Sequence, residues 1–283
     1  MMSSKIILAS DDERIDPKYF SNVLSTYNIG LFVLVPSLLN ILLSENTFIK
    51  SSIKYLIMGG EKLNITLINK LKILLPKTLI FNVYGPTETT IMSLFYLFLS
   101  NEKKSPIGSN FDYDIVALLN KYLQQSVPLI ENELFISGLK VGKGYNNRTK
   151  KTATASLPDI LSNFISERMY ATGDICYIDE RCEIVYIDRK DFQTKRNGQR
   201  IELEEIQSFF LQSPFNLTNV EVILFENNIL LAYYIKNESN ATFSEQEILD
   251  YAITRLESHK VPNAIFGLKE FPYTSTGKLD RKM

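Results

Sequence analysis

The chain has 283 residues, 45% hydrophobic and 22% charged, which is typical of a soluble globular protein of about two domains. Its 31 basic and 32 acidic side chains give a formal net charge of -1, which excludes the basic surface of a nucleic-acid-binding protein. Two cysteines, Cys176 and Cys182, exclude a disulfide framework. The apolar runs are too short to span a bilayer or to form a signal peptide. We therefore expect a cytoplasmic protein with neither a nucleic-acid nor a membrane partner.

The first 110 residues predict alternating helices and strands. Asp16 followed by Pro17 is typical of a helix start, and Pro36 and Asn64 are expected to begin the next two helices. Strands are predicted at the apolar runs of residues 31–35, 53–58 and 78–81. Strands and helices in alternation favour a parallel sheet with helices on its faces, so the predicted fold class is α/β.

The pattern changes to β from about residue 114, and again near residue 191. Strands are predicted at residues 114–118, 133–137, 174–178 and 183–187, and residues 146–167 are expected to form a surface excursion. A small α+β module follows, with helices at residues 201–211 and 244–258, a hairpin at residues 220–235 and a strand at residues 264–268. The predicted domains are residues 1–190, in which an α/β part runs to about 110 and a β-rich part to about 190, and residues 191–283.

The turn after the predicted strand at residues 78–81 is the most informative stretch. Gly85 and Pro86 force a turn, because Gly tolerates unusual φ values and Pro fixes its own. Thr87 and Glu88 then lie at the carboxyl end of a strand, where α/β sheets bind ligands. A hydroxyl beside a carboxylate suits a phosphate and a hard divalent cation. The alternative is an ordinary strand-to-helix turn with a capping Thr.

Six stretches together resemble one enzyme superfamily in order and approximate spacing. They are residues 59–61 (G-G-E), 82–88 (N-V-Y-G-P-T-E), 132–145 (N-E-L-F-I-S-G to G-K-G-Y), 170–174 (Y-A-T-G-D), 188–202 (D-R-K-D-F-Q-T-K to G-Q-R-I-E) and 272–281 (P-Y-T-S-T-G-K-L-D-R). This set resembles the adenylate-forming superfamily of AMP-binding enzymes. The ending G-K-L-D-R and the hinge residue Asp191 are most similar to adenylation domains of nonribosomal peptide synthetases, with the D-alanine carrier-protein ligases as close relatives.

The resemblance implies a reaction and its cofactors. Such enzymes are ligases that condense a carboxylic or amino acid with ATP to an acyl-adenylate, with Mg²⁺, and pass the acyl group to a phosphopantetheine thiol on an acyl or peptidyl carrier protein. Metal and cations offset the negative charge that gathers at the α-phosphate.

The resemblance also implies roles for single residues. Glu88 would ligate Mg²⁺, Thr87 would contact phosphate, and Lys278 would be the mobile catalytic lysine of the small domain, with Asp191 as the hinge. The implied nucleotide-binding set is completed by Gly59, Gly60, Glu61, Asn82, Tyr84, Gly85, Asp174 and Arg189, where Asn82 meets the adenine edge, Tyr84 its face and Asp174 the ribose. The acyl pocket would be lined by Leu34, Ile57, Gly59, Val83, Ile91 and Met92, which are apolar or Gly and favour an apolar substrate side chain.

The chain also departs from the family's pattern. The phosphate loop T-S-G-T-T-G-x-P-K-G is not found, so the chain is expected to be the C-terminal portion of an adenylation domain, with the front half of the large domain as a further partner. Asp188 replaces a Gly beside Arg189. Two hypotheses remain: an adenylating ligase represented by a partial chain, and a degenerate, non-catalytic remnant that serves as an interaction module. An uncovered apolar face is expected in both.

Overall fold

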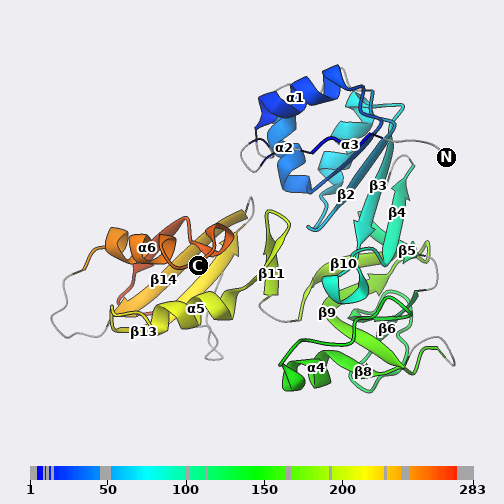
Figure 1. Cartoon of the computed structure of the whole chain (residues 1–283). Coiled ribbons are helices and arrows are strands. Elements are labelled where there is room, and N and C mark those ends of the chain that lie inside the picture. The colour runs from blue at the N-terminus through cyan, green and yellow to red at the C-terminus, as the bar shows by residue number, and fades with distance from the viewer. Residues whose placement is uncertain are drawn as a thin grey trace. The chain divides into compact units, whose positions relative to one another are not determined.

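The chain divides into two compact units, residues 1–191 and 192–283. The computed structural model describes residues 5–8, 10, 13, 16–44, 52–99, 102–111, 114–162, 167–190, 193–225, 228–236 and 243–272. Figure 1 shows that both units combine helices and strands. No helix within these ranges is long and apolar enough to cross a membrane.

The first unit opens with the predicted alternation of helices and strands. Asp16 and Asn64 accept hydrogen bonds from Lys18 N and Thr66 N, and so cap two of the helices as expected. Strands β1, β2 and β3 pair in parallel, which confirms the predicted sheet. The elements are α1 (Pro17–Thr26), β1 (Leu31–Leu34), α2 (Pro36–Ser44), β2 (Tyr55–Gly59), α3 (Ile65–Leu74) and β3 (Leu79–Tyr84).

The sheet continues into the β-rich part by antiparallel pairing. The strand order among the described residues is β1-β2-β3-β4-β5-β10-β9-β7-β6, with β8 paired to β9. The added strands are β4 (Leu94–Phe98), β5 (Pro106–Asn110), β6 (Ile115–Leu119), β7 (Asn132–Ser137), β8 (Ser156–Pro158), β9 (Arg168–Ile178) and β10 (Ile184–Arg189). Residues 146–167 do not form a plain surface excursion, because they contain α4 (Thr149–Ala155) and β8, which pairs with the long strand β9.

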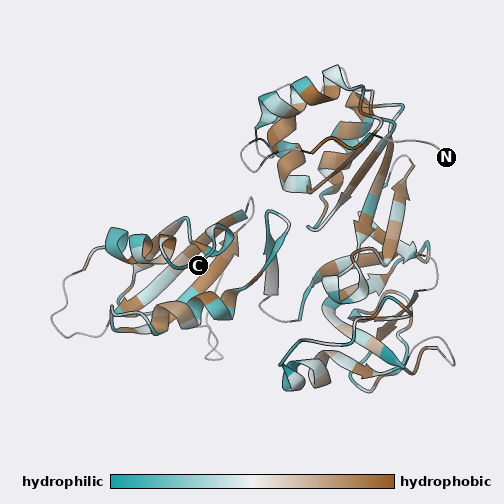
Figure 2. Cartoon of the chain, in the orientation of Figure 1, coloured by the Kyte–Doolittle hydropathy of each residue, from teal (hydrophilic) through white to brown (hydrophobic). Residues whose placement is uncertain are grey.

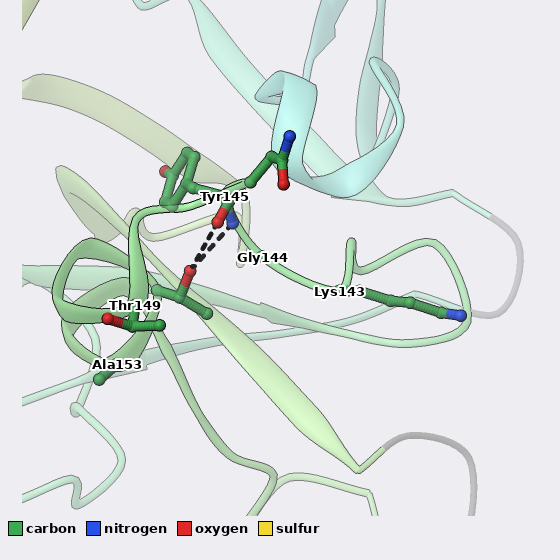
Figure 3. Close-up of a pocket in the computed structure, with 7 residues that line it drawn as sticks. Lys143, Gly144, Tyr145, Thr149 and Ala153 are labelled. Carbon is green, nitrogen blue, oxygen red and sulfur yellow. Dashed lines mark hydrogen bonds between the residues drawn. The ribbon is translucent and has the colours of Figure 1, made fainter.

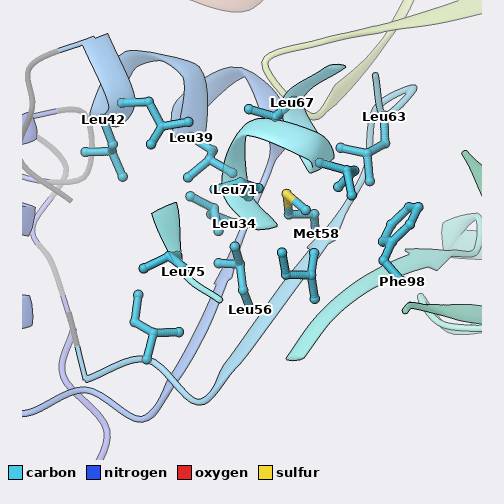
Figure 4. Packing of buried hydrophobic residues seen from close by; sticks show 14 of the residues in the cluster. Leu34, Leu39, Leu42, Leu56, Met58, Leu63, Leu67, Leu71, Leu75 and Phe98 are labelled. Atoms are coloured by element: carbon cyan, nitrogen blue, oxygen red, sulfur yellow. The ribbon is translucent and has the colours of Figure 1, made fainter. Parts of the chain in front are cut away.

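One face of β1–β3 forms a core with the helices. Alternate strand residues point to this face, where Leu56 and Ile80 are fully buried. Both belong to one cluster with helix residues such as Leu39 and Leu71, which are also fully buried, and Figure 4 shows Leu56 among these helix side chains. Each such side chain contributes roughly 1.5–3 kcal/mol on transfer from water.

The opposite face of the same strands is uncovered. Register places Leu31 beside Tyr55 and Tyr55 beside Leu79, and these side chains are 55%, 46% and 42% exposed. Val33, in the next row, is 58% exposed. Figure 2 shows that these strands are largely hydrophobic. The expected uncovered apolar face is therefore present among the described residues.

The second unit is a small α+β module. Its three-stranded sheet has the order β13-β14-β15, with β13 and β14 antiparallel and β14 and β15 parallel. Ser244 and Glu247 form the predicted capping box. The elements are β11 (Gln193–Arg196), β12 (Gln199–Glu202), α5 (Leu203–Leu211), β13 (Leu217–Phe225), β14 (Ile229–Lys236), α6 (Glu245–Ile253) and β15 (Ala264–Gly267).

Two predicted helix boundaries in this unit are wrong. The helix expected at residues 201–211 begins at Leu203, because Ile201 pairs with Thr194 in the β11–β12 hairpin. The helix expected to reach about Ser258 ends at Ile253. There the backbone tightens, since the amide of Arg255 bonds the carbonyl of Ala252 three residues back.

Candidate active site

The turn after β3 is the centre of the candidate site. Gly85 permits it, because a Cβ at this position would lie 2.3 Å from the carbonyl oxygen of Ile91. The backbone makes a 3-10 turn at Thr87–Thr89 and enters the left-handed region at Thr90 and Ile91, with φ of 61° and 73°. β-branched residues adopt this conformation at a cost of roughly 1–3 kcal/mol each. The turn must therefore be held by the rest of the fold.

The loop after β7 holds this turn. Gly142 N donates to the carbonyl of Glu88 at 2.8 Å, and the hydroxyl of Thr90 donates to the carbonyl of Lys140 at 2.9 Å. The Lys140 ammonium donates in turn to the carbonyl of Met92 at 2.9 Å. Two of the sequence motifs, separated by about fifty residues, are thus joined into one surface.

Tyr145, at the end of this loop, fixes the carboxylate of Glu88. Its hydroxyl donates to Glu88 Oε1 at 2.5 Å, and its backbone amide donates to the Thr152 hydroxyl at 2.9 Å. Tyr145 and Thr152 both line a shallow surface hollow between the loop and α4, which Figure 3 shows around Tyr145. Gly144, at φ 127°, is required there, since a Cβ would lie 2.4 Å from Thr152 Cγ2. Tyr145 belongs to the motif at residues 132–145, but nothing in the spacing of that motif predicts its hydrogen bond to Glu88.

The residues present suit a magnesium ion bound together with a nucleotide. Mg²⁺ is held in nucleotide sites by one or two carboxylates plus substrate phosphates, and Glu88 supplies one oriented carboxylate beside the exposed Thr87. Among the described residues no group of three or more His, Cys, Asp or Glu side chains could hold a metal ion. A magnesium ion here would therefore take its remaining ligands from phosphate oxygens and water.

A second cluster joins the end of β3 to the paired strands β9 and β10 through side chains. Tyr84 donates its hydroxyl to Asp174 Oδ2, and Arg189 Nη1 lies 2.9 Å from Asp174 Oδ1 in an ion pair. Strand register explains the pair, since Arg189 is directly opposite Asp174. Burial raises the pKa of Tyr84 well above its ordinary value, and the Asp174 charge adds to the shift, so the phenol stays a donor. Strand β3 therefore connects the Glu88 turn to the Asp174–Arg189 pair.

Among the described contacts, the Asp188 carboxylate does not compete with Asp174 for the Arg189 guanidinium. Its Oδ1 accepts from the backbone amide of Arg189 at 2.8 Å, and the residue is exposed. The new carboxylate that replaces the family's Gly is thus directed to the backbone. The Arg189–Asp174 pair forms despite it.

Two glycines shape the end of β2, and Gly59 allows the close approach to β3. A Cβ on Gly59 would lie 2.5 Å from the carbonyl of Val83, and Gly60 has φ 87°. Glu61 accepts from the backbone and the hydroxyl of Ser37 at 2.9 and 2.8 Å, and so caps the start of α2. This carboxylate serves the fold, and nucleotide binding by Gly59, Gly60 and Glu61 stays a prediction.

Asn82 is 4% exposed and lies within the sheet. Its amide donates to the carbonyl of Pro106 at 2.8 Å and so ties β3 to β5. In this structure Asn82 is a packing residue, and its predicted contact with adenine stays a prediction.

The predicted acyl-pocket residues do not all share a surface. Ile57, Gly59 and Val83 lie on the uncovered side of the sheet, and the turn presents Ile91, which is 70% exposed, next to Met92. Leu34 is the exception, because strand alternation turns it to the helix-covered face, where it is 7% exposed. Leu34 is a core residue, and its assignment to the pocket is wrong. Asp191 and Lys278 lie outside the described residues.

Comparison with known proteins identifies the family. The family model for AMP-binding enzymes matches residues 1–146. The chain belongs to the AMP-binding enzyme family. This agrees with the resemblance read from the six motifs, and the α/β fold class is confirmed.

Individual relatives are nonribosomal peptide synthetases. Surfactin synthase subunit 1 of Bacillus subtilis (strain 168) is 28% identical over 286 residues, which are 99% of this chain and 8% of that protein. Malpibaldin synthetase of Mortierella alpina is 31% identical over 283 residues, which are 98% of this chain and 5% of that protein. The structure of holo-PA1221, an NRPS protein containing adenylation and PCP domains, matches with a TM-score of 0.81 and 26% identity, over 94% of this chain and 46% of that chain. The chain thus spans a small part of the synthetases it matches and 46% of this structural relative.

Proposed function

We propose that this chain is the part of an adenylation enzyme that holds nucleotide and acyl group during ATP-dependent activation of a carboxylic acid. The carboxylate oxygen bonds to the α-phosphorus, the bond to the bridging oxygen breaks, and pyrophosphate leaves with the electron pair. The observation that carries the proposal is the path along β3, which joins the Glu88 turn to the Tyr84–Asp174–Arg189 cluster.

The described residues fit distinct parts of the nucleotide. Glu88 would hold Mg²⁺ together with phosphate oxygens, with Tyr145 fixing its orientation. The metal, when bound, supplies positive charge where phosphate charge is greatest. The exposed Thr87 hydroxyl would donate to a phosphate oxygen, and Arg189 holds Asp174 where two ribose hydroxyls could meet its oxygens. Lys278 would approach the reacting phosphate, a role that rests on the sequence motif.

The substrate we propose is an amino acid with an apolar side chain. Ile57, Val83 and Met92 offer no charged group to pair with, and Gly59 leaves space beside Val83. An acidic or basic side chain would lose its hydration here without an ionic partner.

A carrier protein is the acceptor that we propose for the acyl group. Its phosphopantetheine thiol would attack the acyl carbonyl and release AMP. Support comes from holo-PA1221, which contains adenylation and PCP domains, and from the division of the chain beside Asp191, the proposed hinge.

The uncovered sheet face is where we propose that the front half of the adenylation domain packs. Leu31, Val33, Tyr55 and Leu79 expose a contiguous apolar surface that a soluble protein normally buries. A polypeptide seated there could supply the phosphate loop. We call this chain together with such a front half the complemented enzyme.

The test is substrate-dependent exchange of pyrophosphate into ATP by the complemented enzyme. We expect exchange with an apolar amino acid, and a loss of roughly a hundredfold or more in Lys278→Ala, because a cation at the reacting phosphate is removed. The control is Lys236→Ala, a lysine at the end of β14. An unchanged rate in Lys278→Ala would remove that residue from the mechanism.

The second candidate function is a non-catalytic interaction module. The same uncovered apolar face favours it, because this face could bind a partner whether or not chemistry takes place. This hypothesis predicts neither ATP binding nor exchange, by the chain alone or by the complemented enzyme. Clear amino-acid-dependent exchange would refute it.

A further inference from the structure

Lys140 makes two hydrogen bonds to the strained turn, one through its backbone and one through its side chain. Its backbone carbonyl accepts from the Thr90 hydroxyl at 2.9 Å, and its ammonium donates to the Met92 carbonyl at 2.9 Å. Between these contacts lies Ile91, at φ 73° and 70% exposed. The backbone bonds of the turn itself are short-range: Thr90 N donates to Thr87 O, Met92 N to Thr90 O, and Ile91 N to Pro86 O at 3.3 Å. Lys140 therefore supplies a long-range restraint at the residues that most need one.

The ammonium is itself anchored by a buried charge. Asp114 Oδ2 lies 2.6 Å from Lys140 Nζ, and the Asp114 side chain is 1% exposed. Within the described part of the chain neither carboxylate oxygen of Asp114 accepts a well-directed hydrogen bond, so this carboxylate depends on the ammonium for compensation. The ring of Phe111 lies 5.3 Å from Nζ and covers the cation from another direction. A buried carboxylate with one cationic partner fixes that partner's position.

We propose that Lys140 is a positioning residue that sets the Ile91–Met92 edge of the acyl pocket and thereby the choice of acid. The assignment of this edge to the pocket rests on the proposed function. The buried Asp114 carboxylate fixes the Lys140 ammonium, and the ammonium in turn holds the Met92 carbonyl by a hydrogen bond. Because Met92 follows Ile91 directly, this hydrogen bond also restrains the left-handed backbone of Ile91. Removing the pair allows the turn to relax to ordinary φ values, which moves both side chains.

The first experiment uses this chain alone and needs no activity. Lys140→Met combined with Asp114→Leu removes both charges and leaves apolar side chains of similar length, so no buried carboxylate is left without its cation. We expect the amides of residues 90–93 to exchange hydrogen for deuterium about tenfold faster or more, because local opening becomes easier. Thr90→Val, which removes only the hydroxyl contact, should give a smaller acceleration and is a second variant that leaves the core intact.

The matched control is Lys104→Met. Lys104 also pairs with a carboxylate, Glu180 at 3.4 Å, and lies 5.1 Å from the centre of the Tyr177 ring, but neither partner contacts the turn. The Lys104→Met variant should leave hydrogen–deuterium exchange at the amides of residues 90–93 unchanged. Unchanged exchange in both the double variant and Thr90→Val would overturn the positioning role, whatever the activity of the protein.

The second experiment measures substrate choice in the complemented enzyme. We expect the double variant to raise KM for the preferred amino acid about tenfold and to flatten the ranking among apolar amino acids, with KM for ATP unchanged. A uniform fall in kcat with the ranking intact would show a merely structural role and overturn the proposal. If the parent enzyme shows no exchange at all, the proposed function fails, while the hydrogen-exchange result still decides whether Lys140 holds the turn.

Discussion

The helix-covered core and the turn after β3 differ in how local backbone preference relates to tertiary packing. In the core, local preference and tertiary packing agree: Leu56 and Ile80 alternate into a face that α2 and α3 cover. In the turn they conflict, because Thr90 and Ile91 adopt left-handed backbone that β-branched residues avoid. In the core, local preference and packing favour the same structure, whereas in the turn contacts from distant residues hold the backbone in a conformation that its own residues disfavour.

This difference supports the proposed site on physical grounds alone. Strain of this kind persists only where surrounding contacts over-determine the backbone, and the turn has such contacts from Lys140, Gly142 and Tyr145. The same turn holds Glu88, the proposed metal ligand. Regular packing builds the scaffold, and the enforced turn presents the proposed chemistry.

The largest expected effect is in the core. Leu56→Ala should lower the free energy of unfolding by about 2–5 kcal/mol, because the fully buried side chain leaves a cavity. Leu31→Ala, the same change on the uncovered face of the adjacent strand, should lower it by less than about 1 kcal/mol. Urea unfolding of the chain measures both. Equal losses would mean that the two faces are not different.

The contact between Tyr145 and Glu88 should have a smaller effect, limited to metal use. Tyr145→Phe removes the hydrogen bond to Glu88 Oε1, and we expect the apparent Mg²⁺ affinity of the complemented enzyme to fall about tenfold. Magnesium titration of pyrophosphate exchange is the measurement. Tyr122→Phe, at a 70% exposed tyrosine in another loop, is the control. Equal magnesium dependence in the two variants would contradict a positioning role for Tyr145.

Strain in the turn should appear as a gain of stability when it is relieved. Ile91→Gly should raise the free energy of unfolding by about 1 kcal/mol, since Gly adopts φ 73° freely and the side chain is exposed. Leu129→Gly, at φ 67° in another loop, should raise the free energy of unfolding by a similar amount but should leave the choice of amino acid unchanged. Urea unfolding again measures the change. A clear loss of stability in Ile91→Gly would argue against stored strain.

The smallest expected effect concerns the Asp159 carboxylate, which several hydrogen bonds hold in its charged form. Burial acts to raise the pKa of Asp159, but hydrogen bonds from Ser137, Ser162 and nearby amides outweigh it and hold the pKa below its ordinary value. A lowered pKa in the folded state gives stability that is present above the unfolded value of 3.8 and is lost as the pH falls through the folded value. The difference in urea midpoint between the parent and Asp159→Asn should shrink from about pH 5.5 to about pH 3. A difference that grows on acidification would contradict this sign.

The sequence predicted what local preference controls. Capping chemistry and hydrophobic periodicity act over a few residues, so they predict the caps at Asp16, Asn64 and Ser244 and the strands that pair in parallel. Leu34 was misplaced in the pocket, since one apolar strand does not show which face each residue takes until its neighbours are known.

The candidate site was foreseen in part. Motif order predicts that Glu88, Asp174 and Arg189 share one site, which stays a prediction. The structure joins Asp174 to Arg189 by an ion pair and to Tyr84, on the strand before the Glu88 turn, by a hydrogen bond. The contacts of Lys140 and Tyr145 could not be foreseen, because they join residues about fifty positions apart or more and follow no local pattern.

The most direct test of the account is the structure of the complemented enzyme with a non-hydrolysable acyl-adenylate analogue. We predict that the ribose hydroxyls contact Asp174, that the phosphate analogue lies beside Thr87, and that the acyl side chain meets Met92. A ligand bound away from β3, or no binding at saturating analogue, would contradict the assignment of this surface as an adenylate-forming site.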